Sequence, residues 1–397
     1  MNTNKAERIV IIGASAAGIA AADEIRKIDQ NIELIMISKE DVMGYYRPRL
    51  SEMLSNDKIN LEQITLKKDQ WFEKNNIRLF LNKIVNKIDT ANKKVLLEDG
   101  TEMTFTKLII ASGAEVFVPP FPGRDKKGVF TLRYLKDVEQ IRNYARGKKN
   151  AVVIGGGLLG LEAANGLKGL GLNVSVLEHN DRILPRQLDP EASSLLEEKV
   201  DKFGVRFIKN ANTKELVGTD QLEGILLENG EIIPADLVII STGVKPNIDF
   251  VKDTDIQINR AIVVNEKMET SVADIYAAGD CAEFNNINFA LWIEALEQGK
   301  TAGINAAGGN YTFETIIPYT SLAAFGTSAF SIGDVGSNPE LLYETHKIQD
   351  GDNFKELFFT DGKLCGGILL GDTSKKASIT KGFKTGASKK EMIEKFE

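Results

Sequence analysis

Short apolar runs followed at once by glycine-rich turns are the most regular feature of this sequence. Residues 151–154 form an apolar run short enough for a strand buried on both faces, and residues 155–160 (GGGLLG) follow directly. Apolar residues then recur at helical spacing, at Leu161, Ala164, Leu167 and Leu170. A second apolar run, residues 174–177, ends on Glu178. The pattern predicts a strand, a tight turn, a helix and a second strand.

The spacing of the glycines in this unit is typical of a dinucleotide site. Gly155 suits the tight turn, Gly157 lets the backbone approach a pyrophosphate, and Gly160 lets helix and strand pack closely. The start of the helix, at Leu158 and Leu159, offers free N–H groups and a positive dipole end to the phosphates.

An acid follows this unit at the distance where a ribose is bound. Glu178 lies eighteen residues after Gly160, and an acid there repels a 2′-phosphate. These residues therefore predict a site that favours NADH over NADPH. The alternative is a glycine-rich turn in an α/β domain that binds no nucleotide.

Residues 9–18 (IVIIGASAAG) repeat the same pattern less completely. The turn residues are small, and we expect five of them to contact a nucleotide: Gly13, Ala14, Ser15, Ala16 and Gly18. Ser15 replaces the middle glycine. After a second predicted strand at 32–37, Ser38 stands where the acid belongs. Glu40 is the nearest ribose candidate, although it could equally be a solvated loop acid.

Two nucleotide-binding folds in one chain suggest two nucleotides, and here the sequence resembles the pyridine nucleotide-disulfide reductase superfamily, with FAD bound first and NAD(P)H second. The segment 45–50 (YYRPRL) resembles a flavin loop of NADH:rubredoxin oxidoreductases, which implies that Arg47 lies against FAD. The alternative for Arg47 is an ordinary surface arginine. Related reductases carry a lysine where this chain has Glu52, and Arg49 could supply that positive charge instead.

Further matches to the superfamily follow in chain order. Some imply FAD contacts, at Val85, Ser112, Gly113 and Asp280. Glu162 is expected near the nicotinamide, and Gly243 opens a segment that returns to the FAD domain. Residues 292–305 match the helix under the flavin, and their small side chains allow close packing. A helix-start acid and ordinary core packing are the structural alternatives for Glu162 and for this helix.

The resemblance implies an α/β fold with two Rossmann-like dinucleotide-binding domains, for FAD and NADH, and a small α/β C-terminal domain. We expect the FAD-binding domain at 1–117 and 244–315, the NADH-binding domain at 118–243 and the C-terminal domain at 316–397. The stiff segment 119–123 (PPFPG) is interpreted as the first crossing. In the last domain, Asp361 and Gly362 are typical of a hairpin turn between strands at 357–360 and 363–370.

Composition excludes several other classes of protein. The chain has 397 residues, too many for one core, and its net charge of −7 argues against a nucleic-acid binder. No apolar run is long enough to span a membrane, and the polar start leaves no room for a signal peptide. Two cysteines, Cys281 and Cys365, make no disulfide framework, so a cytoplasmic location is expected. Two histidines give no metal-site spacing, and we expect no metal.

The absence of a cysteine in the flavin loop decides the expected chemistry. Electrons from NADH reach FAD and have no protein thiol to move on to, so we expect an external acceptor, most economically rubredoxin or a similar small iron protein. Hydride transfer to the flavin needs no side-chain acid or base, and none is predicted. A ferredoxin reductase, a nitrite-reductase flavin module, an NADH oxidase and a non-catalytic FAD- and NADH-binding interaction protein remain alternatives.

The lysine-rich end, residues 375–395, could attract an acidic partner or form a solvated helix.

Overall fold

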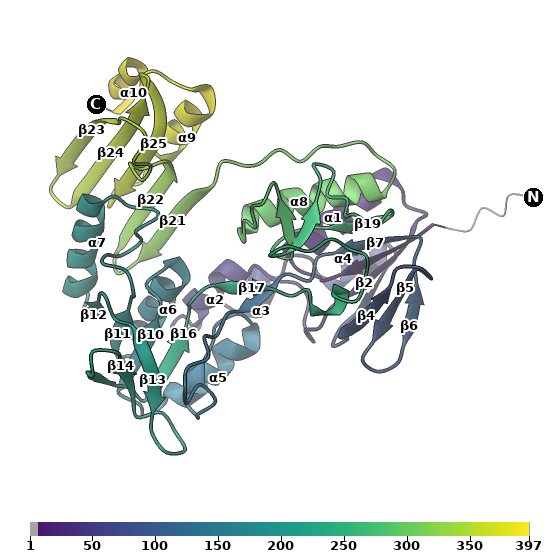
Figure 1. The fold of residues 1–397 in the computed structure, drawn as a ribbon, viewed down its shortest axis with the longest axis horizontal. Helices are drawn as coiled ribbons and strands as arrows, with labels where there is room; N and C mark the ends of the chain where they lie inside the picture. The colour runs from purple at the N-terminus through teal and green to yellow at the C-terminus, as the bar shows by residue number, and fades with distance from the viewer. Residues whose placement is uncertain (1–6, 397) are drawn as a thin grey trace, which may run out of the picture. The chain divides into compact units, whose positions relative to one another are not determined.

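The computed structural model describes residues 7–396, which fall into two compact units. The first unit comprises residues 7–49, 59–115 and 244–316, and the second comprises 50–58, 116–243 and 317–396. Both units are of the α/β type, with helices packed on parallel sheets (Figure 1). The predicted fold class is confirmed, whereas the three-domain boundaries stay a prediction.

A five-stranded parallel sheet forms the core of the first unit. Its strand order is β19 (Ile275–Ala277), β7 (Lys107–Ile110), β1 (Arg8–Ile12), β2 (Glu33–Ile37) and β3 (Ile77–Phe80). The central strands are almost entirely apolar and buried, as strands covered on both faces must be. The predicted strands at 9–12 and 32–37 are therefore confirmed to within one residue.

Two helices of the first unit pack closely against each other at two glycines. These are α1 (Ala16–Ile28) and α8 (Trp292–Ala306). A Cβ added at Gly299 would lie 2.2 Å from the Ala17 carbonyl oxygen, and one at Gly303 would lie 2.4 Å from that of Ala21. The close packing expected from the small residues of 292–305 is confirmed.

Smaller elements complete the first unit. An antiparallel sheet comprises β4 (Val85–Asp89), β5 (Lys94–Leu97) and β6 (Glu102–Thr104). Two short pairs are β18 (Ile262–Val264) with β20 (Ala282–Phe284), and β8 (Ala114–Val116) with β17 (Val244–Pro246). The short helices are η1 (Arg47–Arg49), α3 (Leu61–Ile64), α4 (Asp69–Lys74) and η2 (Asp249–Val251).

The second unit contains a parallel sheet of the same plan. Its order is β12 (Val205–Ile208), β11 (Asn173–Leu177), β10 (Asn150–Ile154), β16 (Leu237–Ile240) and β9 (Val129–Phe130). In the first unit the three-stranded antiparallel sheet follows the edge strand β3 in the chain. In the second unit a similar sheet follows the edge strand β12, and it comprises β13 (Thr213–Val217), β14 (Gly224–Leu227) and β15 (Ile232–Pro234). The helices are α2 (Leu50–Met53), α5 (Leu135–Ala145), α6 (Leu158–Gly169) and α7 (Pro190–Lys202). The two units thus repeat one architecture.

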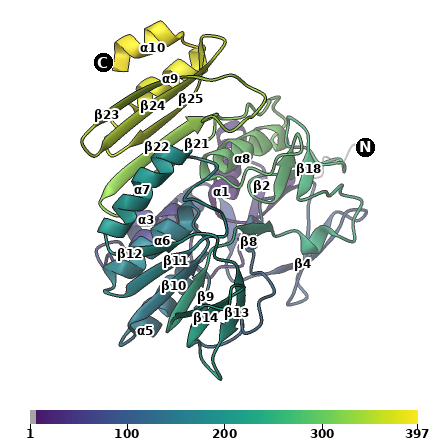
Figure 2. The same ribbon diagram turned by 60° about the vertical axis from the view of Figure 1, so that its left-hand side comes forward.

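The C-terminal part of the second unit is an antiparallel sheet with two helices. The sheet order is β21 (Tyr319–Ala324), β22 (Thr327–Gly333), β25 (Lys363–Leu370), β24 (Asn353–Thr360) and β23 (Glu344–Asp350). Helices α9 (Lys376–Thr385) and α10 (Lys389–Phe396) cover it (Figure 2). The predicted hairpin is confirmed, because Asp361 and Gly362 join β24 to β25 with positive φ angles of 51° and 71°.

Candidate cofactor sites

The turn between β1 and α1 accepts only glycine at two positions. Gly13 has φ +112°, and an added Cβ would lie 2.0 Å from the Ala111 carbonyl oxygen. An added Cβ at Gly18 would lie 1.9 Å from the Gly13 carbonyl oxygen. Ala14 is buried between them. Ser15 is the residue before the helix, and Ala16 is its first residue, so the free N–H groups of α1 lie at this turn.

The turn between β10 and α6 has the same constraints. Gly155 has φ +113°, and an added Cβ would lie 2.2 Å from the Ser241 carbonyl oxygen. An added Cβ at Gly160 would lie 2.0 Å from the Gly155 carbonyl oxygen. At Gly157, by contrast, an added Cβ would meet nothing within 4 Å. Leu158 opens the helix and Leu159 is exposed. Open space in front of free helix N–H groups is what a phosphate needs, so the turn fits a dinucleotide.

Glu178 is held against the second glycine turn. It is 5% exposed, and its Oε2 accepts a hydrogen bond of 2.7 Å from the Gly156 N–H. Its Oε1 accepts hydrogen bonds from the Asn180 backbone N–H (2.9 Å) and side-chain amide (2.6 Å). The structure therefore brings the predicted ribose acid to the predicted phosphate turn. Gly156 and Asn180 are partners that the sequence pattern did not single out.

Three residues predicted to contact FAD form one cluster in the first unit. The Arg47 guanidinium pairs with the Glu40 carboxylate, and its Nε donates to Ser15 Oγ at 3.3 Å. The Tyr45 hydroxyl donates to Glu40 Oε2 at 2.6 Å, and Arg47 lies 5.0 Å from the centre of the Tyr45 ring. Tyr45 is 1% exposed. This tyrosine organises the cluster, and its place in the YYRPRL segment was the available sequence signal.

The backbone before Val85 runs beside the same cluster. The Asn82 N–H donates to the Glu40 carbonyl oxygen, and the Lys83 N–H donates to that of Ser38, both at 2.9 Å. Val85 then begins β4. The structure therefore brings the Val85 segment next to the loop that carries Glu40.

The other predicted FAD contacts lie at the carboxyl ends of adjacent parallel strands. Ser112 and Gly113 follow β7, and Asp280 follows β19, which pairs with β7. Ser112 Oγ donates to the Asn247 carbonyl oxygen at 2.7 Å, and the Gly279 N–H donates to Gln298 Oε1 at 2.8 Å. Because β7 also pairs with β1, these residues and the Gly13 turn share one edge of the sheet, where α/β folds bind ligands.

The cysteine beside this edge is buried and inert. Cys281 is 0% exposed, and its Sγ lies 3.3 Å from the carbonyl oxygens of both Ile110 and Ala278, which share its single S–H donor. Burial raises the pKa of the thiol, which suppresses the reactive thiolate. Cys281 therefore behaves as a small buried hydrophobe.

Glu162 and Gly243 belong to the second unit. Glu162 lies on α6, and Ser51 Oγ on α2 donates to its Oε2 at 3.1 Å. Burial raises the pKa of Glu162 to about 7, the Ser51 hydrogen bond opposes this shift, and the negative charge of Glu52 adds to it. Gly243 has φ +104° and follows β16, which pairs with β10, so it lies at the same sheet edge as Gly155.

The described residues contain neither a metal-binding cluster nor a helix that could span a membrane. Between residues 7 and 396, the structure contains no group of three or more His, Cys, Asp and Glu side chains that could hold a metal ion. Over the same residues, every helix is too short or too polar to cross a bilayer.

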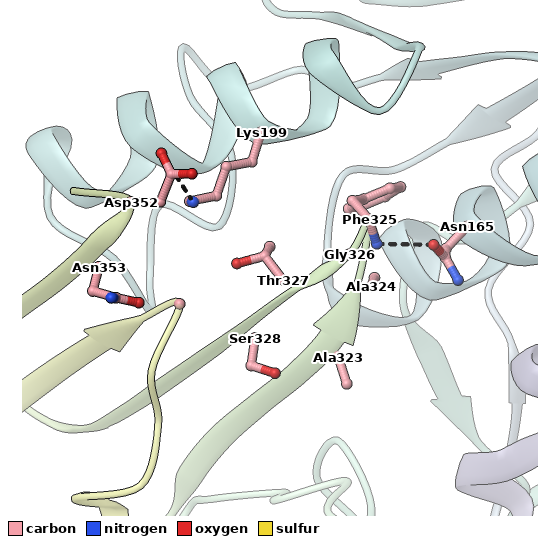
Figure 3. A pocket seen from close by; sticks show the side chains of 11 residues that line it. Asn165, Lys199, Ala323, Ala324, Phe325, Gly326, Thr327, Ser328, Asp352 and Asn353 are labelled. Carbon is pink, nitrogen blue, oxygen red and sulfur yellow. Dashed lines mark hydrogen bonds and ion pairs between the residues drawn. The ribbon is translucent and has the colours of Figure 1, made fainter.

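A cavity of about 540 Å³ lies elsewhere in the second unit (Figure 3). Its polar lining includes Lys199 of α7, whose Nζ lies 3.9 Å from an Asp352 carboxylate oxygen. Asn165 of α6 accepts a hydrogen bond of 2.8 Å from the Phe325 N–H at its rim. None of the predicted cofactor residues lines this cavity.

Comparison with known proteins gives the same picture as the geometry. Residues 7–299 match the family model "Pyridine nucleotide-disulphide oxidoreductase", and residues 318–387 match "Rubredoxin NAD+ reductase C-terminal domain". A nitrite reductase [NAD(P)H] of Bacillus subtilis is 36% identical over 93% of this chain. This chain spans 46% of that enzyme, about half its length.

Two further similarities cover nearly whole chains. An NADH-rubredoxin oxidoreductase of Clostridium acetobutylicum is 35% identical over 95% of this chain and 94% of its own length. The crystal structure of NADH:rubredoxin oxidoreductase from that organism superposes with a TM-score of 0.82 at 34% identity, covering 96% of each chain.

Proposed function

The chain belongs to the pyridine nucleotide-disulphide oxidoreductase family, and we propose that it passes electrons from NADH through FAD to rubredoxin. It is an oxidoreductase whose cofactors are FAD and NADH. The observation that carries the proposal is a pair of glycine turns, one on each parallel sheet, together with the burial of Cys281 near the first turn, which raises the pKa of its thiol. The cytoplasmic location expected from the sequence stays a prediction.

The first unit supplies the proposed FAD site. The turn from Gly13 to Gly18 and the start of α1 would receive the pyrophosphate, because the first N–H groups of a helix have no partner within the helix. The cluster of Glu40 and Arg47 holds the neighbouring part of the cofactor, with Tyr45 fixing both side chains. Asp280 closes the same edge from β19.

The second unit supplies the proposed NADH site. The open space at Gly157 admits the pyrophosphate, and Glu178, already fixed by Gly156, accepts a hydrogen bond from a ribose hydroxyl. Its negative charge would repel the 2′-phosphate of NADPH.

When bound, FAD supplies the redox chemistry by accepting a hydride and returning single electrons. The residues of the chain bind and orient the two dinucleotides, and none of them has to transfer a proton in the hydride step.

Rubredoxin is proposed as acceptor for two reasons. The YYRPRL segment resembles that of NADH:rubredoxin oxidoreductases, and residues 318–387 match a C-terminal domain named for rubredoxin NAD+ reductase. Cys281 is buried and its thiol has a raised pKa, so electrons have to leave for an external acceptor. The identity with nitrite reductase favours a second candidate, the flavin module of such an enzyme.

Acceptor assays on the purified, FAD-loaded protein test the proposal. We expect a yellow flavin spectrum, rapid bleaching by NADH, and faster turnover with rubredoxin than with ferredoxin, oxygen or nitrite. Faster turnover with another acceptor would refute rubredoxin but leave the NADH-to-FAD step intact. A colourless protein that cannot be reconstituted with FAD would refute the whole proposal, and slow reduction of every acceptor would favour an interaction protein.

A further inference from the structure

Glu294 is a buried carboxylic acid of the first unit. It lies in the first turn of α8 and is 1% exposed. Among residues 7–396, neither of its carboxylate oxygens has a hydrogen-bond partner of normal geometry. Ionised carboxylates are rarely buried in this way, because they lose hydration without compensation. The protonation state of Glu294 therefore has to be explained.

The position of Glu294 points to the proposed FAD site. One turn further along α8, Gln298 Oε1 accepts a hydrogen bond of 2.8 Å from the Gly279 N–H, next to Asp280. Two residues before Glu294, the Trp292 ring packs edge-on against Tyr46 of the YYRPRL segment, with ring centres 5.0 Å apart. Glu294 thus lies between two contacts that join α8 to the segments proposed to hold FAD.

Burial and the nearby charges give Glu294 a pKa close to neutral pH. Burial raises the pKa of Glu294 to about 7, the Ile316 backbone opposes this shift, and the negative charge of Glu297 adds to it. Glu297 itself lies on α8 and is paired with Lys300 Nζ and with the Tyr311 hydroxyl, both at 3.0 Å. Glu297 is therefore partly neutralised, while Glu294 is not.

We propose, on the basis of the function above, that Glu294 takes up a proton from water when electrons arrive at the FAD site and releases it when they leave. A hydride brings two electrons and one proton, so it adds one negative charge to the site. The proton bound by the Glu294 carboxylate cancels that charge. When two electrons pass to two one-electron acceptors, the proton of the hydride and the proton of Glu294 both return to water.

The proposal makes the reduction equilibrium of bound FAD depend on pH through Glu294. Below pH 7 the acid is protonated in both redox states and contributes nothing. Above pH 7 it is ionised in the oxidised protein, whereas the charge of reduction raises its pKa and restores the proton. Above pH 7, each pH unit lowers the equilibrium constant for two-electron reduction of FAD by an extra factor of about ten. This factor is equivalent to about 30 mV in the midpoint potential.

Redox titration of the flavin absorbance, at pH values on both sides of 7, tests this in the FAD-loaded protein. We expect the plot of midpoint potential against pH to steepen above pH 7 in the wild type, and from a somewhat lower pH in Glu297→Gln, where a charge that raises the pKa of Glu294 is removed, but not in Glu294→Gln. The Glu297 variant is the matched control, since it removes an acid from the same helix. A wild-type inflection that persists in Glu294→Gln would overturn the proposal.

A second measurement needs no variant and separates this proposal from the proposed function. An infrared difference spectrum, reduced minus oxidised and recorded above pH 7, should show a new protonated-carboxyl band in the wild type. If the protein binds and reduces FAD but gains no such band, the role of Glu294 is refuted and the function stands. If it binds no FAD, the function itself is refuted.

Discussion

The carboxylate of Glu178 is fixed by the protein before any nucleotide arrives. One oxygen accepts the Gly156 N–H of the glycine turn, and the other accepts two N–H groups of Asn180. Because these bonds set the direction of the side chain, its remaining lone pairs are presented in a defined geometry. Because the side chain is already ordered, less conformational entropy is lost when a ligand binds to it, and the affinity is higher.

Glu178→Gln should therefore weaken discrimination between the two nicotinamide cofactors. The amide keeps one oxygen for Gly156 but loses the negative charge and the acceptor for the Asn180 N–H groups, so KM for NADH should rise by about tenfold, as for a lost charge-assisted hydrogen bond. KM for NADPH should change little or fall. Steady-state kinetics with both cofactors measures the ratio, and Glu228→Gln, an exposed acid in the same unit, serves as control. An unchanged ratio would remove the role given to Glu178.

Replacing both cysteines by alanine should leave electron transfer almost intact. Cys281 is fully buried with a raised thiol pKa, and Cys365 is half-buried, with its pKa also raised by burial. Loss of the weak hydrogen bond that the Cys281 thiol shares between two carbonyl oxygens should reduce stability by about 1 kcal/mol. Rates of flavin reduction by NADH and of transfer to the acceptor test this, alongside the unfolding midpoint. A large loss of rate at normal stability would show that a thiol takes part.

At the scale of elements, the close contact between α1 and α8 depends on glycines of α8, which have no side chain. At Gly299 the Ala17 carbonyl oxygen occupies the space where a Cβ would stand. The helix faces can approach this closely because glycine has no Cβ. The predicted FAD turn at the start of α1 and the Gly279 segment bound by α8 are held together by this contact.

Gly299→Ala should destabilise the first unit, although alanine is the better helix former. The added methyl would lie 2.2 Å from the Ala17 oxygen, so the helices must separate, at a cost of about 1–3 kcal/mol. Leu296→Ala changes an exposed position of the same helix and should cost less than Gly299→Ala. Chemical denaturation of both variants, with FAD content measured in parallel, checks this. Equal stability of Gly299→Ala and wild type would show that the helices adjust freely.

The strands of the two parallel sheets could be predicted because burial on both faces leaves uninterrupted apolar runs. The observed β1, β10 and β16 begin or end within one residue of the runs in the sequence. The helical end of the chain was harder to predict, since charge dominates its pattern. Gly386, with φ +60°, divides it into α9 and α10, whereas a solvated helix was one of the two interpretations of this end. A glycine of this kind is a typical helix stop.

The candidate sites were predictable where backbone geometry dictates the residue. Gly13, Gly155 and Gly160 have neighbouring carbonyl oxygens in place of a Cβ, and only glycine satisfies that. Partners chosen by side-chain packing could not be read from spacing. Asn180 and Tyr45 are such partners, because hydrogen bonds of this kind form between side chains that the fold brings together.

At the scale of the whole molecule, two buried carboxylic acids and one half-buried one share one property. Burial raises the pKa of Glu162, Glu294 and Glu356 to about 7 in each case. For Glu356 on β24, the charge of Asp189 adds to the shift and Lys347 opposes it, with Lys347 Nζ at 3.3 Å from Glu356 Oε1. Both units thus contain acids that prefer to be neutral when folded.

The folded protein should therefore lose stability as pH rises from 4.5 to 7. In that window the unfolded chain has released these protons, whereas the folded chain still binds them, so the free energy of unfolding falls with pH and levels off above 7. Changing all three acids to Gln should flatten the fall, by about 1 kcal/mol or more per group. Urea unfolding midpoints across this range measure it. A triple variant with the wild-type slope would mean that other groups control the pH dependence.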